Sequence, residues 1–376
     1  VANDPVIMGS TAAVAKSVTV QSGAVLTISA TGSLTIDGSA TQGILNQGTV
    51  ENSGILNIGQ TTSTGQFGIN SSGTFNNNMD GQINIDRSTV RGLVSNGTFN
   101  NYATITIGVN AAVGQYGFQS GGTFNNNTGG QITVNRGTTY MFWSPTGTFT
   151  NAATINIGTN ASVSGFVGLE NGTTFHNIAG GQINIPKGGT AAFRNNGTFN
   201  NSANISIGAT LGGNGQGLYN TGTFNNNTGG QITIDGCTSA GLAQPQSTAI
   251  FNNNASITIG ATTGVGSHGL TNSNNAIFNN NASGQIVIDR STSAGINVGS
   301  SSAFHNFGRI TIGATASVGN FGVSNSSIFN NNACATLTSF APISNASTRT
   351  ITNSGLFTVN TANASTNDGT FTNNGI

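Results

Sequence analysis

Apolar residues recur at three positions in every stretch of about 25 residues, and Asn, Thr, Ser and Gly fill the sequence between them. The most regular apolar position is nearly always Phe. Its members are Val50, Phe75, Phe99, Phe124, Phe149, Phe175, Phe199, Phe224, Phe251, Phe278, Phe304, Phe329, Ile351 and Phe371. An Asn follows each of them two residues later: Asn52, Asn77, Asn101, Asn126, Asn151, Asn177, Asn201, Asn226, Asn253, Asn280, Asn306, Asn331, Asn353 and Asn373.

The other two apolar positions also predict strands. After each Phe comes an alternating run such as Ile105-Thr106-Ile107, which is typical of a strand buried on one face. The third position lies shortly before the next Phe, at Ile44, Ile69, Leu93, Phe118, Leu169, Phe193, Leu218, Leu242, Leu270, Ile296 and Val323. Three short strands per repeat predict an all-β fold, a single-stranded right-handed parallel β-helix (β-solenoid) of about 14 coils.

Stacking explains the repetition, because one coil of about 25 residues cannot bury its own apolar face. Coils stacked about 4.8 Å apart place like residues on like. We therefore expect a Phe ladder, an Ile ladder and an Asn ladder whose amides bond from coil to coil. The repeated stretch GTFNNNTGGQIT, at 122–133 and 222–233, indicates a larger unit of about 50 residues in which two coil types alternate.

The predicted organisation is one solenoid with a short lead-in. Residues 1–17 are expected to form an irregular N-terminal lead-in that serves as an assembly arm. Residues 18–376 are expected to form one continuous β-solenoid, with regular coils over about 44–340 and shorter, irregular coils over 341–376.

Composition excludes several partners. Only 5% of the 376 residues are charged, and nine Lys and Arg balance nine Asp and Glu, so no basic face is expected for nucleic acid or an anionic membrane. No apolar run approaches the length of a membrane span. A net charge near zero favours self-association. The start at Val1 predicts a mature secreted form whose targeting segment has been removed.

Aligned acids raise an enzyme hypothesis. Asp86, Asp235 and Asp289 follow the Ile pair in alternate coils, and sugar-cleaving β-helices use carboxylates on one face. Asn135 and Pro186 stand at the equivalent places of the intervening copies, and Arg87 and Arg290 sit beside two of the acids as neutralising partners. A polysaccharide-degrading enzyme therefore ranks below a non-enzymatic function.

Other chemistry is weakly indicated. Outward Thr pairs such as Thr104 and Thr106 suggest an ice-binding face, although Val287 and Arg309 interrupt the polar file. The Gly-Gly-Gln-Ile runs lack the third Gly and the spacing of a calcium-binding repeat, and the three His residues are scattered. We expect no cofactor and no metal. Cys237 and Cys334 lie four coils apart, beyond disulfide reach.

Candidate contact residues lie in three places. The run Tyr140-Met141-Phe142-Trp143 needs only one large side chain inside, either Phe142 or Trp143. The other aromatic side chains of this run, including Tyr140, are then expected to cluster on the outer surface. The two end segments supply Val6, Ile7, Met8, Phe371 and Ile376, which we expect to join one subunit to the next.

Columns such as Gly97-Thr98-Phe99-Asn100-Asn101 and Ile105-Thr106-Ile107 resemble the β-solenoid shafts of secreted bacterial surface proteins, the filamentous haemagglutinins and autotransporter passengers. This resemblance implies an extracellular protein of the cell surface. The expected function is that of a structural subunit that forms a head-to-tail homopolymer. The alternative is a monomeric adhesin that binds a surface glycan or a protein.

Overall fold

The computed structural model describes residues 4–9, 12–159, 167–186, 188–208 and 215–376. The chain divides into two compact units, Val1–Ile185 and Pro186–Ile376, which are described separately below. The described residues form strands, isolated bridges, turns, bends and irregular segments, and none of them is helical. The predicted fold class is confirmed: the chain is all-β and forms a parallel β-solenoid of about 14 turns with a spacing of about 25 residues.

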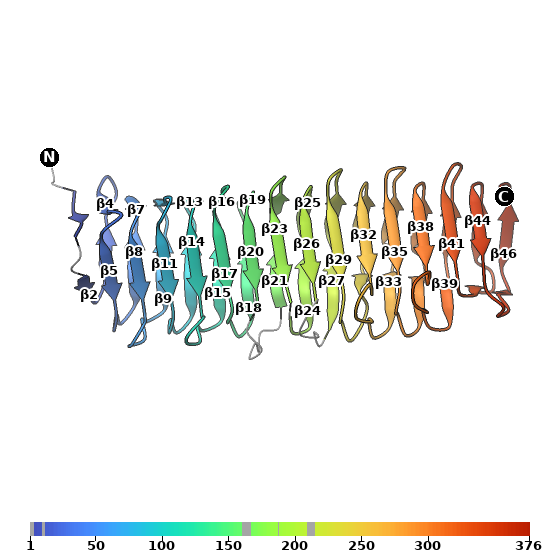
Figure 1. Cartoon of the computed structure of the whole chain (residues 1–376), viewed down its shortest axis with the longest axis horizontal. Helices are drawn as coiled ribbons and strands as arrows, with labels where there is room; N and C mark the ends of the chain where they lie inside the picture. Colours follow the sequence, from blue (N-terminus) through green and yellow to red (C-terminus); the bar gives the residue numbers. More distant parts are fainter. Residues whose placement is uncertain (1–3, 10–11, 160–166, 187, 209–214) are drawn as a thin grey trace. The chain divides into compact units, whose positions relative to one another are not determined.

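Each coil contributes one strand to each of three parallel sheets, named here A, B and C. Strands of successive coils lie side by side within each unit (Figure 1). In the usual four-residue strand the second and fourth side chains are buried and the first and third face outward, as at Thr104–Ile107. This is the period-2 alternation predicted from the sequence.

Among the described residues, the first unit contributes eight strands to sheet A, eight to sheet B and seven to sheet C. Sheet A contains β1 (Val6–Ile7), β4 (Val25–Ile28), β7 (Thr49–Asn52), β10 (Thr74–Asn77), β13 (Thr98–Asn101), β16 (Thr123–Asn126), β19 (Thr148–Asn151) and β22 (Thr174–Asn177). Sheet B contains β2 (Ala13–Ala15), β5 (Ser33–Ile36), β8 (Ile55–Ile58), β11 (Gln82–Ile85), β14 (Thr104–Ile107), β17 (Gln131–Val134), β20 (Thr154–Ile157) and β23 (Gln182–Ile185). Sheet C contains β3 (Val18–Val20), β6 (Gln42–Asn46), β9 (Phe67–Ser71), β12 (Arg91–Ser95), β15 (Tyr116–Ser120), β18 (Tyr140–Ser144) and β21 (Val167–Asn171).

The second unit repeats the pattern. Sheet A contains β25 (Thr198–Asn201), β28 (Thr223–Asn226), β31 (Ile250–Asn253), β34 (Ile277–Asn280), β37 (Ala303–Asn306), β40 (Ile328–Asn331), β43 (Thr350–Asn353) and β46 (Thr370–Asn373). Sheet B contains β26 (Asn204–Ile207), β29 (Gln231–Ile234), β32 (Ser256–Ile259), β35 (Gln285–Ile288), β38 (Arg309–Ile312), β41 (Thr336–Ser339) and β44 (Leu356–Val359). Sheet C contains β24 (Ala191–Asn195), β27 (Gln216–Asn220), β30 (Leu242–Gln244), β33 (His268–Asn272), β36 (Ala294–Val298), β39 (Phe321–Asn325), β42 (Ile343–Asn345) and β45 (Thr366–Asn367).

The register places like residues on like, as predicted. Phe75 pairs with Phe99 and Asn77 with Asn101, and Ile83 pairs with Ile105 on the next sheet. Phe rings of adjacent coils stack nearly parallel, with centroids 4.6 Å apart for Phe75 and Phe99 and 4.7 Å apart for Phe224 and Phe251. The rings therefore form one continuous column in the core of each unit, where offset stacking adds to area burial.

The corner between sheets A and B alternates in length. Residues 78–81 join β10 to β11, whereas only residues 102–103 join β13 to β14 and residues 127–130 join β16 to β17. Gly129 in the long corner has φ 90°, a conformation that glycine adopts without strain. This alternation accounts for the predicted unit of about 50 residues.

The lead-in is more regular than predicted. β1 pairs with β4 and β2 pairs with β5, so these residues belong to a coil in register with the next. Their strands are only two and three residues long, too short for a visible period-2 pattern, which is why the sequence suggested an irregular arm. Residues 1–3 and 10–11 of the predicted lead-in lie outside the described residues.

Candidate functional site

The aligned acids are buried and bonded to the following coil. Asp289 is 3% exposed; its Oδ1 accepts the N–H groups of Thr315 and Ala316 at 3.2 and 3.4 Å, and its Oδ2 accepts the Thr315 hydroxyl at 2.7 Å. Asp86 and Asp235 accept equivalent bonds from 110–111 and 262–263. Each carboxylate thus holds the turn of the next coil, in the way that a side-chain oxygen caps a helix N-terminus.

The neighbouring arginines do not neutralise these acids, contrary to the prediction. Arg290 donates from Nη1 to the carbonyl oxygens of Gly260, at 2.9 Å, and Ala261 in the preceding coil. Arg87 does the same to Gly59 and Gln60. Both arginines have positive φ, 51° and 50°, which turns the side chain away from the adjacent Asp and back toward the coil before it. Asp and Arg therefore connect three successive coils.

The Asn column forms a buried amide ladder within each unit. In the first unit, each Nδ2 donates to the Oδ1 of the next coil at 2.7 or 2.8 Å along Asn52, Asn77, Asn101, Asn126, Asn151 and Asn177. In the second unit, the same bond runs along Asn201, Asn226, Asn253, Asn280, Asn306, Asn331, Asn353 and Asn373. The predicted Asn ladder is confirmed, and it satisfies amides that would otherwise be buried without partners.

A second amide ladder went unpredicted. It runs along the last position of sheet C, from Asn195 to Asn220 at 2.8 Å, to Gln244 at 2.8 Å and to Asn272 at 3.1 Å. Its signal is present in the sequence, because Asn stands two residues after Leu218 and two after Leu270, as it does after Phe in the first column. Ser71, Ser95, Ser120 and Ser144 occupy the same column in other coils and hide the pattern.

The aromatic cluster of the first unit lies on the outer face of sheet C. Phe142 and Met141 are fully buried, which confirms that one aromatic of this strand points inward. Tyr140 and Trp143 are half-buried, and the Trp143 ring stacks on Tyr116 with centroids 4.9 Å apart. The guanidinium of Arg91 lies between Phe67 and Tyr116, at 5.5 and 5.3 Å from their ring centroids. These aromatic and cationic side chains pack against one another along the outer face of sheet C, which adds to the stability of this wall.

The first coil leaves its apolar side chains partly uncovered. Val6 and Met8 are 49% and 67% exposed, and Ile7 is half-buried on Ile28. A cavity of about 240 Å³ beside them is lined by Pro5, Val18, Val20, Leu26 and neighbouring residues.

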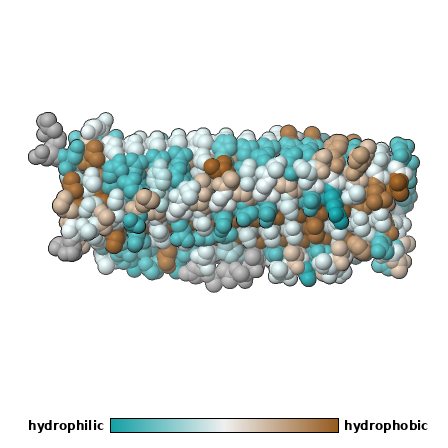
Figure 2. Space-filling view, turned by 45° about the horizontal axis from the view of Figure 1, so that its top comes forward, coloured by the Kyte–Doolittle hydropathy of each residue, from teal (hydrophilic) through white to brown (hydrophobic). Residues whose placement is uncertain are grey.

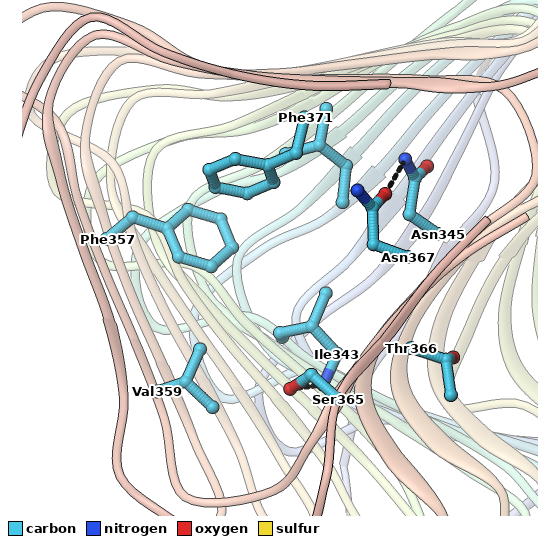
Figure 3. A pocket seen from close by; sticks show the side chains of 9 residues that line it. Ile343, Asn345, Phe357, Val359, Ser365, Thr366, Asn367 and Phe371 are labelled. Carbon is cyan, nitrogen blue, oxygen red and sulfur yellow. Dashed lines mark hydrogen bonds between the residues drawn. The ribbon is translucent and has the colours of Figure 1, made fainter. Parts of the chain in front are cut away.

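The last coil exposes the ladder positions that are buried elsewhere. Phe371 belongs to the Phe column yet is 41% exposed, and its ring meets Phe357 edge to face with centroids 5.7 Å apart. The two rings, with Val359 and Ile343, surround a cavity of about 300 Å³ that opens between the strands of the three sheets (Figure 3). Asn345 donates to Asn367 at its rim at 2.8 Å. Ile376 is 85% exposed.

The remaining titratable groups include three His and two Cys residues. In the part of the chain that the structure describes, no three His, Cys, Asp or Glu side chains are placed to hold a metal ion. Cys237 and Cys334 are free thiols, one buried and one exposed. Burial lowers the pKa of His268 and of His305, so both imidazoles are held toward the neutral form.

The described residues include no helix long and apolar enough to cross a membrane. The outer surface seen in Figure 2 is mostly hydrophilic or weakly polar, with scattered hydrophobic residues. No protein-family model, no curated protein and no solved structure matches this chain.

Proposed function

We propose that the chain is a non-enzymatic structural protein of the cell exterior, whose copies associate head to tail by stacking coil on coil. The observation that carries the proposal is the register of the stack: within each unit Phe lies on Phe and Asn on Asn from coil to coil, so a coil of another copy can continue the same columns. Strand edges at such a layer pair readily with a further strand.

Apolar side chains line both outermost described coils, with Phe357, Val359 and Phe371 around the cavity of the last one. The first described coil is also apolar. Its sheet A register puts Ile7 on Ile28 and Ile28 on Asn52, so the amide ladder is replaced by aliphatic side chains at this edge. Aliphatic side chains suit a cavity lined by two Phe rings and Val359, because this contact removes apolar area from water on both sides. A contact between different surfaces of two copies propagates into an open filament.

The use of the aligned acids supports a structural function over a catalytic one. Asp86, Asp235 and Asp289 are engaged with backbone N–H groups of the next coil, and a carboxylate so engaged is not free to accept a substrate proton. Placement outside the cell follows from the resemblance to secreted bacterial surface solenoids.

Paired variants test the proposal by sedimentation velocity and electron microscopy of the 376-residue chain. Phe371→Asp places a charge in the cavity of the last coil, and Met8→Asp places one at the first coil; each variant alone should stay monomeric. A mixture of the two variants should form dimers only. Phe371→Asp retains the first coil and Met8→Asp retains the last coil, so one contact forms and no intact surface remains to extend it. The matched control is Phe307→Asp, since Phe307 is 43% exposed but lies at a lateral corner.

Two results would overturn the proposal. One is an unaltered chain that stays monodisperse at high concentration. The other is a Phe307→Asp chain that loses association while Phe371→Asp retains it, which would indicate lateral rather than end-to-end contact.

A further inference from the structure

A polar niche lies at the A–B corner of the first unit, around Tyr102. The long corners at 78–81 and 127–130 project on either side of the short corner at 102–103, so the short corner forms the floor of a recess. The recess has a volume of about 470 Å³, and its lining includes Met79, Asp80, Gln82, Tyr102, Thr104 and Gly129. This volume lies within the range of small-molecule sites.

Three residues of the niche depart from the repeat at the same place. Asp80 replaces the glycine found at Gly129, Gly180 and Gly229, and it adopts φ 68° although it is not glycine. Met79 replaces Thr or Ala, and Tyr102 replaces Ala152, Ser202 or Asn254, while Phe307 is a second aromatic residue at this corner position. The other copies form their corners without these side chains, so the fold does not require them. A non-glycine residue in the left-handed region costs about 1–3 kcal/mol, and such residues cluster at functional sites.

The polar side chains of the niche have no hydrogen-bond partner among the residues that the structure describes. Nearby outward side chains bond to one another: Asn100 donates to Asn76 at 2.9 Å, and the Thr106 hydroxyl donates to Asn84 at 2.6 Å. The side chains of Asp80, Gln82, Tyr102 and Thr104 make no hydrogen bond with the described part of the chain. Two hydroxyls, an amide and a carboxylate therefore line the recess without hydrogen-bond partners among the described residues.

We propose that this niche binds one neutral pyranose unit of a glycan. Tyr102 is 40% exposed and offers an aromatic surface for the C–H face of a sugar ring. The Asp80 carboxylate accepts hydrogen bonds from sugar hydroxyls, while Gln82 and Thr104 both donate and accept. No cationic side chain is among the residues that line the niche, and its one charge is negative, so sulfated and acidic sugars are disfavoured. The site is independent of filament assembly.

The second unit contains a matched niche without these features. It lies over the short corner at 254–255, has a volume of about 220 Å³ and lacks an aromatic side chain. There the Ser283 hydroxyl already donates to the Asn254 carbonyl at 2.8 Å. The comparison isolates Met79, Asp80 and Tyr102 as the residues that distinguish the first niche.

Isothermal titration calorimetry with neutral tetrasaccharides tests the site, the probes being β-linked gluco-, manno- and N-acetylglucosamine oligomers. At least one should bind the unaltered chain with one site per chain. Tyr102→Asn and Asp80→Gly install residues that the repeat itself uses, so the fold should persist, and each should weaken binding by about tenfold or more. Asn254→Ala, in the matched niche, should leave the affinity unchanged.

Several results would overturn the proposal. One is that no neutral oligomer binds. Another is that a sulfated oligosaccharide, or the cation choline, binds more tightly than the neutral oligomer. A third is that Tyr102→Asn binds the neutral oligomer with the same affinity as the unaltered chain. Saturation-transfer NMR with the bound oligosaccharide supplies a second readout, since its C–H protons should receive magnetisation from the Tyr102 ring in the unaltered chain and lose it in Tyr102→Asn.

Discussion

A single buried amide connects three coils in this protein. Asn126 is 1% exposed; its Oδ1 accepts from Asn101 at 2.7 Å, and its Nδ2 donates to Asn151 at 2.8 Å and to the Thr154 carbonyl at 3.3 Å. The preceding residue of the same strand, Asn125, points to the outer face of sheet A. Its amide donates to Asn100 at 2.9 Å, but the residue is only half-buried. The same residue type therefore makes a similar bond in two environments, and the cost of losing it should differ.

We expect Asn126→Ala to lower the free energy of unfolding by about 2–4 kcal/mol, because the Asn101 Nδ2 donor is left buried and unpaired and the Asn151 Oδ1 keeps only the Ala153 N–H, at 3.4 Å. Asn125→Ala, the control, should lower it by less than about 1 kcal/mol, since water replaces the lost partner. Urea unfolding followed by circular dichroism measures both. Equal losses would contradict the assigned difference in burial.

The two thiols should react at very different rates. Burial, and secondarily the nearby Asp235 charge, raises the pKa of Cys237 from 9.0 to about 12, whereas Cys334 is exposed. Because the thiolate is the nucleophile, iodoacetamide at pH 8 should label Cys334 and spare Cys237, as read by peptide mass spectrometry. Both should label in urea, and rapid labelling of Cys237 in the folded chain would contradict its burial.

The same shift has a consequence for alkaline stability. The pKa of Cys237 is raised on folding, so the folded chain keeps the proton after the unfolded chain has lost it. The contribution is fully present below about pH 9 and is lost as the pH rises toward about 12. Cys237→Ala should remove part of the fall in melting temperature over this range. An identical pH profile in the variant would show that the thiol makes no contribution.

At the scale of the element, successive coils are connected because a side chain of one coil caps a turn of the next. The Asp position after sheet B serves this purpose, and Asn135 performs it too, since its Oδ1 accepts from the Thr159 N–H at 3.1 Å. An acceptor oxygen thus caps the turn at this position with or without a negative charge, and Pro186 stands there in another coil. This explains why the acids align in the sequence without forming a catalytic pair.

We therefore expect Asp289→Asn to change the free energy of unfolding by less than about 1 kcal/mol, and Asp289→Ala to lower it by about 2–3 kcal/mol through loss of the bonds to Thr315 and Ala316. Thermal unfolding of the two variants, compared with the unaltered chain, measures the difference. Equal destabilisation by both would show that the charge, rather than the acceptor geometry, is what the turn needs.

At the scale of the whole molecule, the near absence of charge sets how copies interact. Nine basic and nine acidic residues in 376 leave no net charge to repel another copy or to attract a charged partner. Association by apolar stacking and strand pairing should then be insensitive to screening. Sedimentation velocity in about 0.05 M and about 0.5 M NaCl should show the same distribution. Dissolution of the assemblies by salt would instead indicate charge pairing between copies.

The sequence by itself determined the coil, because stacking places identical positions on one another and any side chain tolerated there must suit its own copy above and below. The Phe and Asn columns were therefore visible without coordinates. The Ser residues in the sheet C column concealed the second amide ladder. The two- and three-residue strands at Val6–Ile7 and Ala13–Ala15 were too short to show a period.

Only the tertiary structure decided what the outward side chains contact. Asp86 and Arg87 are adjacent in the chain, yet Asp86 bonds to the coil after it and Arg87 to the coil before it, because a positive φ at Arg87 separates their directions. Tyr102 lies in a recess because the corners on either side of it are two residues longer than its own. Neither fact is a property of one repeat: each depends on how three successive coils differ, and so appears only when they are stacked.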